Sequence, residues 1–392
     1  MIYNTFKKFN THGRLRTVVL GSYFFPEYFS KIKNPRVRDP LMRMAEEINE
    51  DLDKFQQVLE NFGATVIRAP QPIGYFDQSN IYHPPLQVRN SHAVIGNYMY
   101  RFNPDWHDPI DPVLRNYCPD IINLEKDNTN FYLTSMEIAK ENYNPERNIW
   151  YSRDKYHELA GSDWPSYDSF VKGIGSSSLE IREEMLSFKS TLEYETKELA
   201  PLQGPNVINT KDFICVDANE YCNYESWFQD YIKDSRPIRQ FTSKAGHVDG
   251  CFAVLGNKTI LGIDLFIDYA RFFPGYTVVR VPPESYQDQI YEFKLMKKKV
   301  NGAWWLAGEE HNDEFINYVE THLKSWVGYV AESVFDVNVL ALDEHTICVS
   351  NITKDIQKQL SSRGIECILV PWRHRFFVDG GLHCITLDLY RD

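Results

Sequence analysis

Residues 250–263 read GCFAVLGNKTILGI, with apolar and β-branched residues on either side of a Gly-Asn pair. Short apolar runs separated by such a pair predict strand, tight turn, strand. Residues 92–102, HAVIGNYMYRF, repeat the pattern around a second Gly-Asn pair. The chain is therefore expected to use this strand-turn-strand unit more than once.

Helical patterns lie between further strands at both ends of the chain. Near the start, the strand-like residues 14–25 precede a helix that is predicted to begin at Asp39 and Pro40 and to run to Gly63, and the strand-like residues 64–70 follow it. Near the end, the same order returns as strands in 337–351, a helix in 352–364 and a strand in 365–372. These β-turn-β-helix-β modules favour a repeated α/β architecture over one doubly wound sheet.

The composition is that of an ordinary globular protein. The chain has 392 residues, of which 43% are apolar and 14% aromatic, so a single domain over 1–392 can bury a large core. Residues 141–204 are more polar and charged, and we interpret them as an insertion within that domain. A formal charge of -12 disfavours nucleic acid and anionic membranes as partners.

Targeting signals and close cysteine pairs are both missing from the sequence. No stretch has the ~20 consecutive apolar residues of a membrane helix, and the polar start lacks the apolar block of a secretory signal. A cytoplasmic location is therefore expected. The seven cysteines are scattered, so neither a disulfide framework nor a zinc ribbon is predicted.

Two short segments carry residues that are typical of catalytic sites. In KAGHVDGCF, His247 and Asp249 are two apart at what reads as the start of a strand, so their side chains would face the same way. In GGLHC, two glycines and His383 precede Cys384. Adjacent strand residues point to opposite faces, so His383 is not expected to be the base for Cys384, whereas His247 is available.

Each segment also has a simpler interpretation. A strand with alternating polarity often exposes polar residues such as His247 and Asp249, and a cysteine in an apolar strand is usually a small core residue. A further alternative is a zinc site formed by His247, His374, His383 and Cys384. These residues lack the short spacings of structural or hydrolytic zinc sites, so no metal or other cofactor is predicted.

The segments around these residues resemble a known family. GHVDGCFAVLGNKTIL, FDVNVLALDEHTICVS and GGLHCITLDLYR, with weaker matches in RTVVLG, VRNSHAVIGN and NTKDFICVDANE, resemble the amidinotransferases, the glycine amidinotransferase type in particular. These enzymes belong to the guanidine-modifying superfamily that includes arginine deiminases and dimethylarginine hydrolases. The likeness touches most of the chain outside 141–204.

The resemblance implies a fold, a mechanism and a set of partners. The fold is a pentein-type, five-bladed α/β propeller of ββαβ modules with pseudo-fivefold symmetry around a central pocket. Cys384 would attack a guanidinium carbon and form a covalent intermediate, with His247 as acid/base and Asp249 as a carboxylate that holds substrate nitrogens. The implied partners are a small-molecule guanidino donor such as arginine and an amine acceptor. The sequence does not fix the oligomeric state, and a homodimer stays open.

The chain departs from the family at several substrate-binding positions. Two family acids align with Asn90 in VRN and Asn209 in NTKD. Neutral amides bind a guanidinium less tightly than carboxylates, by about 2 to 4 kcal/mol for two contacts, whereas their NH2 groups suit a ureido, carbamoyl or amide substrate. Glu332 stands where a small hydroxyl residue is expected, and the family's carboxylate-binding arginine is absent from its place. These changes indicate a substrate without the usual amino-acid headgroup.

Three functions are compatible with these observations. The first is an amidinotransferase-like enzyme that transfers an amidino or related C–N group to an amine. The second is a hydrolase of a guanidino or ureido compound on the same Cys384 and His247, with water as the acceptor. The third is a catalytically silent binding protein on this fold. The presence of Cys384, His247 and Asp249 together favours an enzyme.

Overall fold

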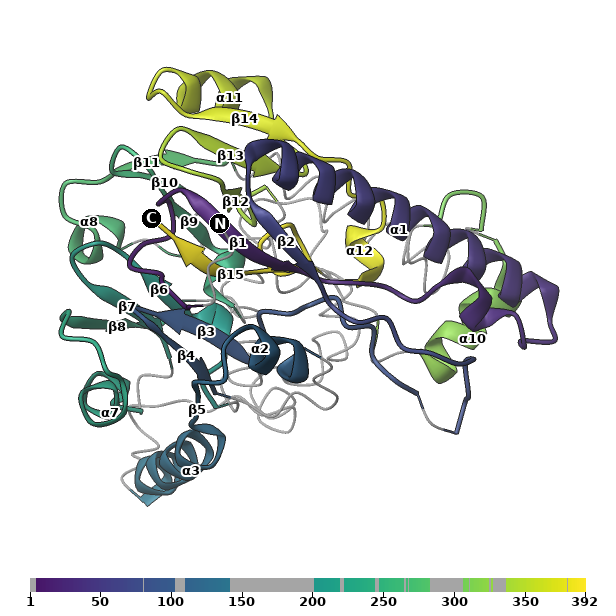
Figure 1. Cartoon of the computed structure of the whole chain (residues 1–392), viewed down its shortest axis with the longest axis horizontal. Helices are drawn as coiled ribbons and strands as arrows, with labels where there is room; N and C mark the ends of the chain where they lie inside the picture. Colours follow the sequence, from purple (N-terminus) through teal and green to yellow (C-terminus); the bar gives the residue numbers. More distant parts are fainter. Residues whose placement is uncertain are drawn as a thin grey trace, which may run out of the picture.

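The protein has an α/β fold built from small sheets. The computed structural model describes residues 5–79, 81–102, 110–141, 201–218, 222–243, 247–263, 266, 268–282, 306–309, 311–323, 326, 336–378 and 380–392. Within these residues, the strands form five three-stranded sheets (Figure 1). In each sheet, the central strand pairs with one antiparallel and one parallel neighbour. A helix connects the two parallel strands each time, so the predicted ββαβ order recurs.

The first sheet joins the two ends of the chain. It contains β1 (Leu15–Leu20), its parallel neighbour β2 (Thr65–Arg68) and its antiparallel neighbour β15 (Thr386–Arg391). The N and C marks accordingly lie close together in Figure 1. This pairing brings the segment that contains Cys384 next to the start of the chain.

The other four sheets follow one another along the sequence. Their strands are β3 (His92–Ile95), β4 (Tyr98–Arg101) and β5 (Ile121–Asn123); β6 (Val207–Asn209), β7 (Ile214–Asp217) and β8 (Ile238–Phe241); β9 (Phe252–Leu255), β10 (Thr259–Gly262) and β11 (Thr277–Arg280); and β12 (Leu340–Ala341), β13 (Thr346–Val349) and β14 (Glu366–Leu369). The helices that connect the parallel strands are α1 (Pro35–Phe62), α2 (Asp111–Tyr117), α7 (Tyr224–Tyr231), α8 (Tyr269–Phe272) and α11 (Lys354–Ser361). Further helices are η1 (Pro26–Phe29), α3 (Glu125–Glu141), η2 (Gly204–Asn206), η3 (Val248–Gly250), α10 (Asp313–His322) and α12 (Arg375–Val378).

Both predicted Gly-Asn hairpins are confirmed. Strands β3 and β4 pair antiparallel across a turn in which Gly96 has a φ of 59°. Strands β9 and β10 pair antiparallel across the three-residue loop 256–258, in which Asn257 and Lys258 have φ values of 54° and 50°. Two- and three-residue hairpin loops need positive φ at one or more positions, and glycine and asparagine adopt it most readily. The local sequence thus specified both turns.

Helix α1 begins earlier than the sequence predicts. Its first residue is Pro35, and the side chain of Asn34 accepts a hydrogen bond from the backbone N–H of Arg36. Pro40, predicted as the start, lies inside the helix, where its ring nitrogen has no hydrogen to donate to the carbonyl of Arg36. Nδ2 of Asn312 donates to that carbonyl at 2.7 Å. A distant side chain therefore makes a proline tolerable here.

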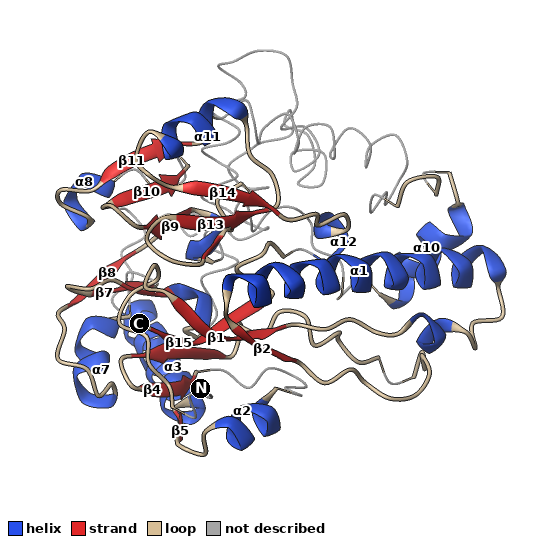
Figure 2. Ribbon diagram, turned by 45° about the horizontal axis from the view of Figure 1, so that its top comes forward, coloured by secondary structure: helices blue, strands red, loops and turns tan. Residues whose placement is uncertain are grey.

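The predicted apolar face of α1 is confirmed. Its buried positions are Leu41, Met44, Ile48, Leu52, Phe55 and Leu59, each no more than 1% exposed. They belong to one hydrophobic cluster that also includes side chains of β1 and α10. Figure 2 shows α1 extending beyond the first sheet, with α10 beside it. The helix ends at Gly63, in the left-handed conformation, as predicted.

Some expectations lie outside the described residues. Residues 142–200, which make up most of the insertion predicted over 141–204, are among them, and so is Glu332. No helix in the described part of the chain is long and apolar enough to cross a membrane.

Candidate functional site

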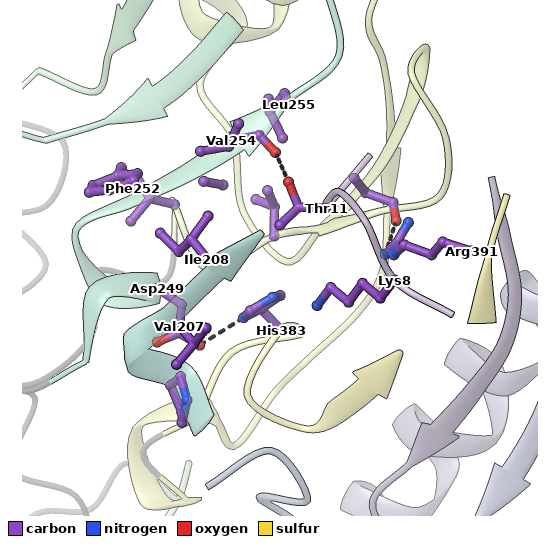
Figure 3. Close-up of a pocket in the computed structure, with 15 residues that line it drawn as sticks. Lys8, Thr11, Val207, Ile208, Asp249, Phe252, Val254, Leu255, His383 and Arg391 are labelled. Carbon is purple, nitrogen blue, oxygen red and sulfur yellow. Dashed lines mark hydrogen bonds and ion pairs between the residues drawn. The ribbon is translucent and has the colours of Figure 1, made fainter. Parts of the chain in front are cut away.

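Cys384 lies in a turn and not in a strand. Residues 382–385 form this turn, and β15 begins after it. The predicted alternation of His383 and Cys384 is therefore wrong, because a turn does not alternate its side chains. Nδ1 of His383 lies 2.8 Å from Oδ2 of Asp249 (Figure 3). Sγ of Cys384 lies 3.5 Å from the same oxygen. Both side chains therefore converge on one carboxylate.

The sulfur of Cys384 is buried among polar groups. The residue is 3% exposed, and Nδ2 of Asn338 lies 3.0 Å from Sγ. Burial, followed by the charge of Asp249, raises the pKa of the thiol well above its usual value. Without a ligand, the thiol is therefore expected to be protonated at neutral pH.

Asp249 carries a negative charge that is only partly compensated. Burial alone would raise its pKa, but the hydrogen bond from His383 and, at the low pH where this carboxyl titrates, the positive charges around it outweigh burial and lower the pKa. Its Oδ2 contacts His383 and Cys384. Its Oδ1 is buried and has no hydrogen-bond partner among the described residues. A buried carboxylate oxygen without a donor is costly, so this atom is ready to accept a hydrogen bond from a ligand.

His383 is held in its neutral form. Burial, and next the charge of Arg89, lower its pKa to about 4. At pH 7 its Nδ1–H therefore donates to Asp249, which fixes the orientation of that carboxylate. Nε of Arg89 donates to the backbone carbonyl of His383 at 3.1 Å and holds the turn from the other side.

His247 stands at the start of a 3-10 helix and not in a strand as predicted. Residues Val248–Gly250 form η3, because the chain turns before β9 begins. Nε2 of His247 lies 2.7 Å from Oε1 of Gln203. Within the described residues, no hydrogen bond joins His247 to Cys384. The predicted meeting of these two side chains stays a prediction.

Gln203 reaches His247 because η2 packs closely against the second sheet. The N–H of Gly204 donates to the carbonyl of Asn90 at 3.0 Å. A Cβ added at Gly204 would stand 2.2 Å from the carbonyl oxygen of Arg89, a distance that real Cβ atoms do not show. Only glycine allows this approach. Gln203, next to it, thus becomes the partner of His247.

Asn90 is hydrogen-bonded to Gln87, and Gln87 lies beside Gly380. Nδ2 of Asn90 donates to Oε1 of Gln87 at 2.9 Å. A Cβ added at Gly380 would stand 3.4 Å from Nε2 of Gln87 and 3.6 Å from Cβ of Cys384. Gly380 is therefore the spacer between this amide pair and the cysteine. The structure brings Asn90 into the surroundings of the predicted nucleophile.

Asn209 makes contacts that lead away from Cys384. It is fully buried in β6, and its Nδ2 donates to the carbonyl of Val94 at 3.0 Å. Its Oδ1 accepts a hydrogen bond from Arg236 at 3.0 Å. These contacts do not join Asn209 to the group around Cys384. The amide that contacts the candidate acid/base is that of Gln203, a residue that the sequence motifs did not indicate.

A cluster of buried charges lies behind the turn that carries Cys384. Asp388 accepts hydrogen bonds from Lys8 at 2.8 Å, from Arg391 at 2.7 Å and from Arg89. Burial alone would raise the pKa of Asp388, but these cations hold it well below its usual value. Burial, and to a smaller extent Arg89 and Arg391, lower the pKa of Lys8 to about 7.

A narrow cavity lies between this cluster and the candidate catalytic residues. Lys8, Asp249, His383 and Arg391 line it, and Figure 3 shows Lys8 directed towards His383. Its volume of about 30 Å³ admits one or two water molecules and no guanidino compound. This cavity is therefore not the substrate pocket.

The described residues do not bring the considered zinc ligands together. Nε2 of His374 lies 2.7 Å from a carboxylate oxygen of Glu47. In the described part of the chain, no three His, Cys, Asp or Glu side chains are grouped as a metal site requires.

Two residues of this site, Gln203 and Asn338, were missed from the sequence, and so was the contact between His383 and Asp249. One signal was available for Asn338, which is a polar residue inside the apolar run VNVLAL. A buried asparagine in such a run needs specific hydrogen-bond partners. No comparable signal pointed to Gln203, because its position depends on how η2 packs.

Comparison with known proteins identifies similar sequences and folds. No protein-family model matches the chain. Over 213 residues it is 24% identical to the mitochondrial glycine amidinotransferase of Danio rerio. The match covers 51% of this chain but only 41% of that protein, so the chain aligns with less than half of this relative.

Two solved amidinotransferases share the fold over nearly the whole chain. One is SxtG from Microseira wollei, of the saxitoxin biosynthetic pathway, with a TM-score of 0.57, 16% identity and coverage of 98% of this chain and 97% of that one. The other is the inosamine-phosphate amidinotransferase StrB1 from Streptomyces griseus, with a TM-score of 0.55, 13% identity and the same coverages, 98% and 97%. The chain is thus similar in sequence to one amidinotransferase and in fold to two others, which agrees with the resemblance of its motifs.

Proposed function

We propose that this chain is a cysteine-dependent enzyme of the amidinotransferase type. It transfers an amidino or related C–N group from a guanidino donor such as arginine to an amine acceptor, through a covalent intermediate on Cys384. The observation that carries the proposal is the convergence of Cys384 and His383 on Oδ2 of Asp249, while Oδ1 of Asp249 stays without a partner among the described residues. Three proteins to which the chain is similar in sequence or fold are amidinotransferases.

The free oxygen of Asp249 selects for a cationic N–H donor. A guanidinium group offers several N–H bonds and one delocalised charge, and a hydrogen bond between two charged groups is roughly twice as strong as a neutral one. Binding at Oδ1 would place the planar group next to Sγ, because the other oxygen of the same carboxylate lies 3.5 Å from the sulfur. Asp249 thus orients the donor for attack.

Binding of a cation also activates the thiol. Burial and the charge of Asp249 oppose ionisation of Cys384 in the free protein. A guanidinium on Oδ1 neutralises that charge, so the thiolate forms where it is needed. The proton released by the thiol passes to His247. The thiolate attacks the guanidinium carbon, a C–S bond forms, and the C–N bond to the leaving amine breaks as His247 returns the proton to that amine. The acceptor amine attacks the same carbon and releases the sulfur.

His247 is the proposed proton carrier. Gln203 fixes its ring through Nε2, which leaves Nδ1 to give a proton to the leaving amine and to take one from the acceptor amine. Gln203 is neutral, so it orients the imidazole ring without favouring the protonated, charged form of the ring as a carboxylate would. The described contacts do not join His247 to the sulfur, so the substrate would lie between them.

The proposed pocket lies at the centre of a five-bladed propeller. The five ββαβ units support this arrangement, and so does the return of the last strand to the first sheet. Asn90 would then contact the substrate through its amide, together with Gln87. We leave Asn209 out of the ligand set because its amide is held by Val94 and Arg236. A role for Glu332, a cytoplasmic location and a homodimer stay predictions.

Intact-mass analysis after incubation with arginine and a panel of amines tests this function. An adduct on Cys384 with turnover that depends on an amine supports transfer, and Cys384→Ala should abolish both. The control is Cys367→Ser, which removes a half-buried thiol outside the site. Ammonia release without an amine acceptor would instead indicate the hydrolase. No adduct with any guanidino or ureido compound, and ligand binding unchanged by Cys384→Ala, would indicate a binding protein.

A further inference from the structure

The side chain of Asn338 is the most completely bonded polar group near Cys384. It is fully buried just before β12. Its Oδ1 accepts two backbone hydrogen bonds, from the N–H of His383 at 2.9 Å and from the N–H of Cys384 at 3.2 Å. Its Nδ2 lies 3.2 Å from the carbonyl oxygen of Asp249 and 3.0 Å from Sγ of Cys384. An asparagine amide has two donors and two acceptor positions, and all four are in use here.

These partners fix which end of the amide faces the sulfur. The oxygen and nitrogen of an asparagine are assigned from their surroundings, and a flipped assignment has to be considered. A backbone N–H can only donate, and a backbone carbonyl can only accept. A flip would set NH2 against the two N–H groups of His383 and Cys384, and the oxygen against the carbonyl of Asp249. The sulfur therefore faces a hydrogen of Nδ2.

A hydrogen directed at the sulfur stabilises the thiolate of Cys384 more than its thiol. A thiol is a weak hydrogen-bond acceptor, whereas a thiolate is a strong one. On its other side, Sγ faces Oδ2 of Asp249, which favours the protonated thiol. Asn338 is thus the described side chain that opposes Asp249 at the sulfur.

Gly381 keeps the amide in this position. A Cβ added at Gly381 would stand 2.5 Å from Oδ1 of Asn338 and 2.6 Å from its Cβ and Cγ. None of these atoms belongs to a flexible chain end, since the whole amide is held by hydrogen bonds. Any side chain at residue 381 would therefore displace Asn338 from the cysteine. The close packing of Asn338 thus explains why the second residue of the GGLHC segment is glycine, which the sequence alone did not show.

We propose that Asn338, kept in place by Gly381, is a positioning residue that orients Sγ of Cys384 and stabilises its thiolate. The inference deepens the proposed function, because it takes Cys384 as the nucleophile. The side chain of Asn338, which comes just before the fifth sheet, contacts the turn before β15. The same side chain also contacts the segment that carries Asp249. One amide thereby sets the distance between nucleophile and carboxylate.

The test is the pH profile of Cys384 alkylation by iodoacetamide, read by peptide mass mapping. Asn338→Asp keeps the size and the oxygen that accepts from the turn, but it replaces the donor at sulfur by a charged acceptor. We expect the alkylation rate at pH 8 to fall about 10- to 100-fold and the profile to move to higher pH, from the loss of one hydrogen bond to a charged sulfur. Cys367 is the internal control, and its rate should not change. Asn116→Asp, at an exposed position, is the charge-matched control.

Two further measurements keep the proposal testable if a buried aspartate prevents folding. Gly381→Ala leaves the amide chemistry intact and should slow alkylation of Cys384 in the same direction. In the wild-type protein, the side-chain NH2 signals of Asn338 in an NMR titration should shift with ionisation of Cys384. Unchanged alkylation of Cys384 in a folded variant, or NH2 signals that ignore the ionisation, would overturn the proposal.

These readouts are independent of turnover. If alkylation responds as expected but Cys384→Ala retains full activity, the proposed function fails and the positioning role of Asn338 stands. If Cys384→Ala is inactive and alkylation ignores Asn338 and Gly381, the function stands and this inference fails. With an active enzyme, Asn338→Asp should lower kcat with little change in KM for the donor.

Discussion

Replacement of the buried carboxylate of Asp388 should be among the most damaging conservative changes in this chain. Asp388 is 1% exposed and is the described acceptor shared by Lys8, Arg89 and Arg391, whose side chains are 1 to 4% exposed. Asp388→Asn keeps the shape and one acceptor oxygen but removes the negative charge that these three cations share. The backbone partners of Arg391 at Gly13 and Ala341 remain.

The expected cost follows from these three contacts. A charge-assisted hydrogen bond exceeds a neutral one by about 1 kcal/mol, so three contacts give about 3 kcal/mol. Removal of one partner from a buried ionic group typically costs about 3 to 5 kcal/mol, which agrees. Loss of the proton of Lys8 reduces this cost, because it removes one of the three cations, and the pKa of Lys8 is already about 7. The destabilisation should therefore be larger at pH 6 than at pH 9.

Thermal and denaturant unfolding at both pH values measure this effect. The matched control is Asp392→Asn, which removes the partially exposed partner of Arg16 on the same terminal segment and should cost no more than about 1 kcal/mol. Adding Lys8→Met to Asp388→Asn should recover part of the loss, because one buried cation disappears. If Asp388→Asn proves no more harmful than the control, the cluster does not hold the chain ends together and the argument is refuted.

Three further predictions concern other contacts. Gln203→Leu removes the described acceptor of the His247 ring and should lower kcat about tenfold or more with little change in KM, as measured by steady-state kinetics; an unchanged kcat would deny the positioning role of Gln203. Burial lowers the pKa of Lys8 from 10.5 to about 7, so between these pH values the unfolded chain binds more protons and stability should rise with pH. Lys8→Met should abolish that rise in the unfolding free energy, and a rise that persists would have another origin. Asn312→Ala should destabilise by about 2 kcal/mol in denaturant unfolding, because it exposes the carbonyl of Arg36 and removes the cap of α10; a neutral result would mean that water replaces both bonds.

Local sequence determined the elements of this fold. The Gly-Asn pairs predicted both hairpins, because positive φ at a turn is a property of the residues that make it. The apolar spacing of α1 predicted its buried face, since the period of a helix is fixed by its backbone. The start of α1 was predicted four residues late, at Asp39 instead of Pro35. Pro40 was read as a first-turn proline, and the carbonyl it frees is satisfied by Asn312 from a distant helix.

The sequence also predicted the kind of chemistry at the candidate site. A cysteine after two glycines and a histidine and aspartate two apart indicated a nucleophile, an acid/base and a carboxylate. The structure brings Cys384 and Asp249 together across 135 positions of the chain. The resemblance to the amidinotransferases, drawn from the same segments, is confirmed by one sequence match and by two shared folds.

Only the tertiary structure decided which side chains serve these residues. His383 turns onto Asp249 because its segment is a turn, and the sequence predicted a strand there. Gln203 bonds to His247 because a glycine lets η2 approach the second sheet, and Asn338 faces Cys384 from the edge of the fifth. Such contacts depend on how five small sheets pack around one another. Residue spacing reports the direction of a side chain along its own element, but it carries no information on which element will face it.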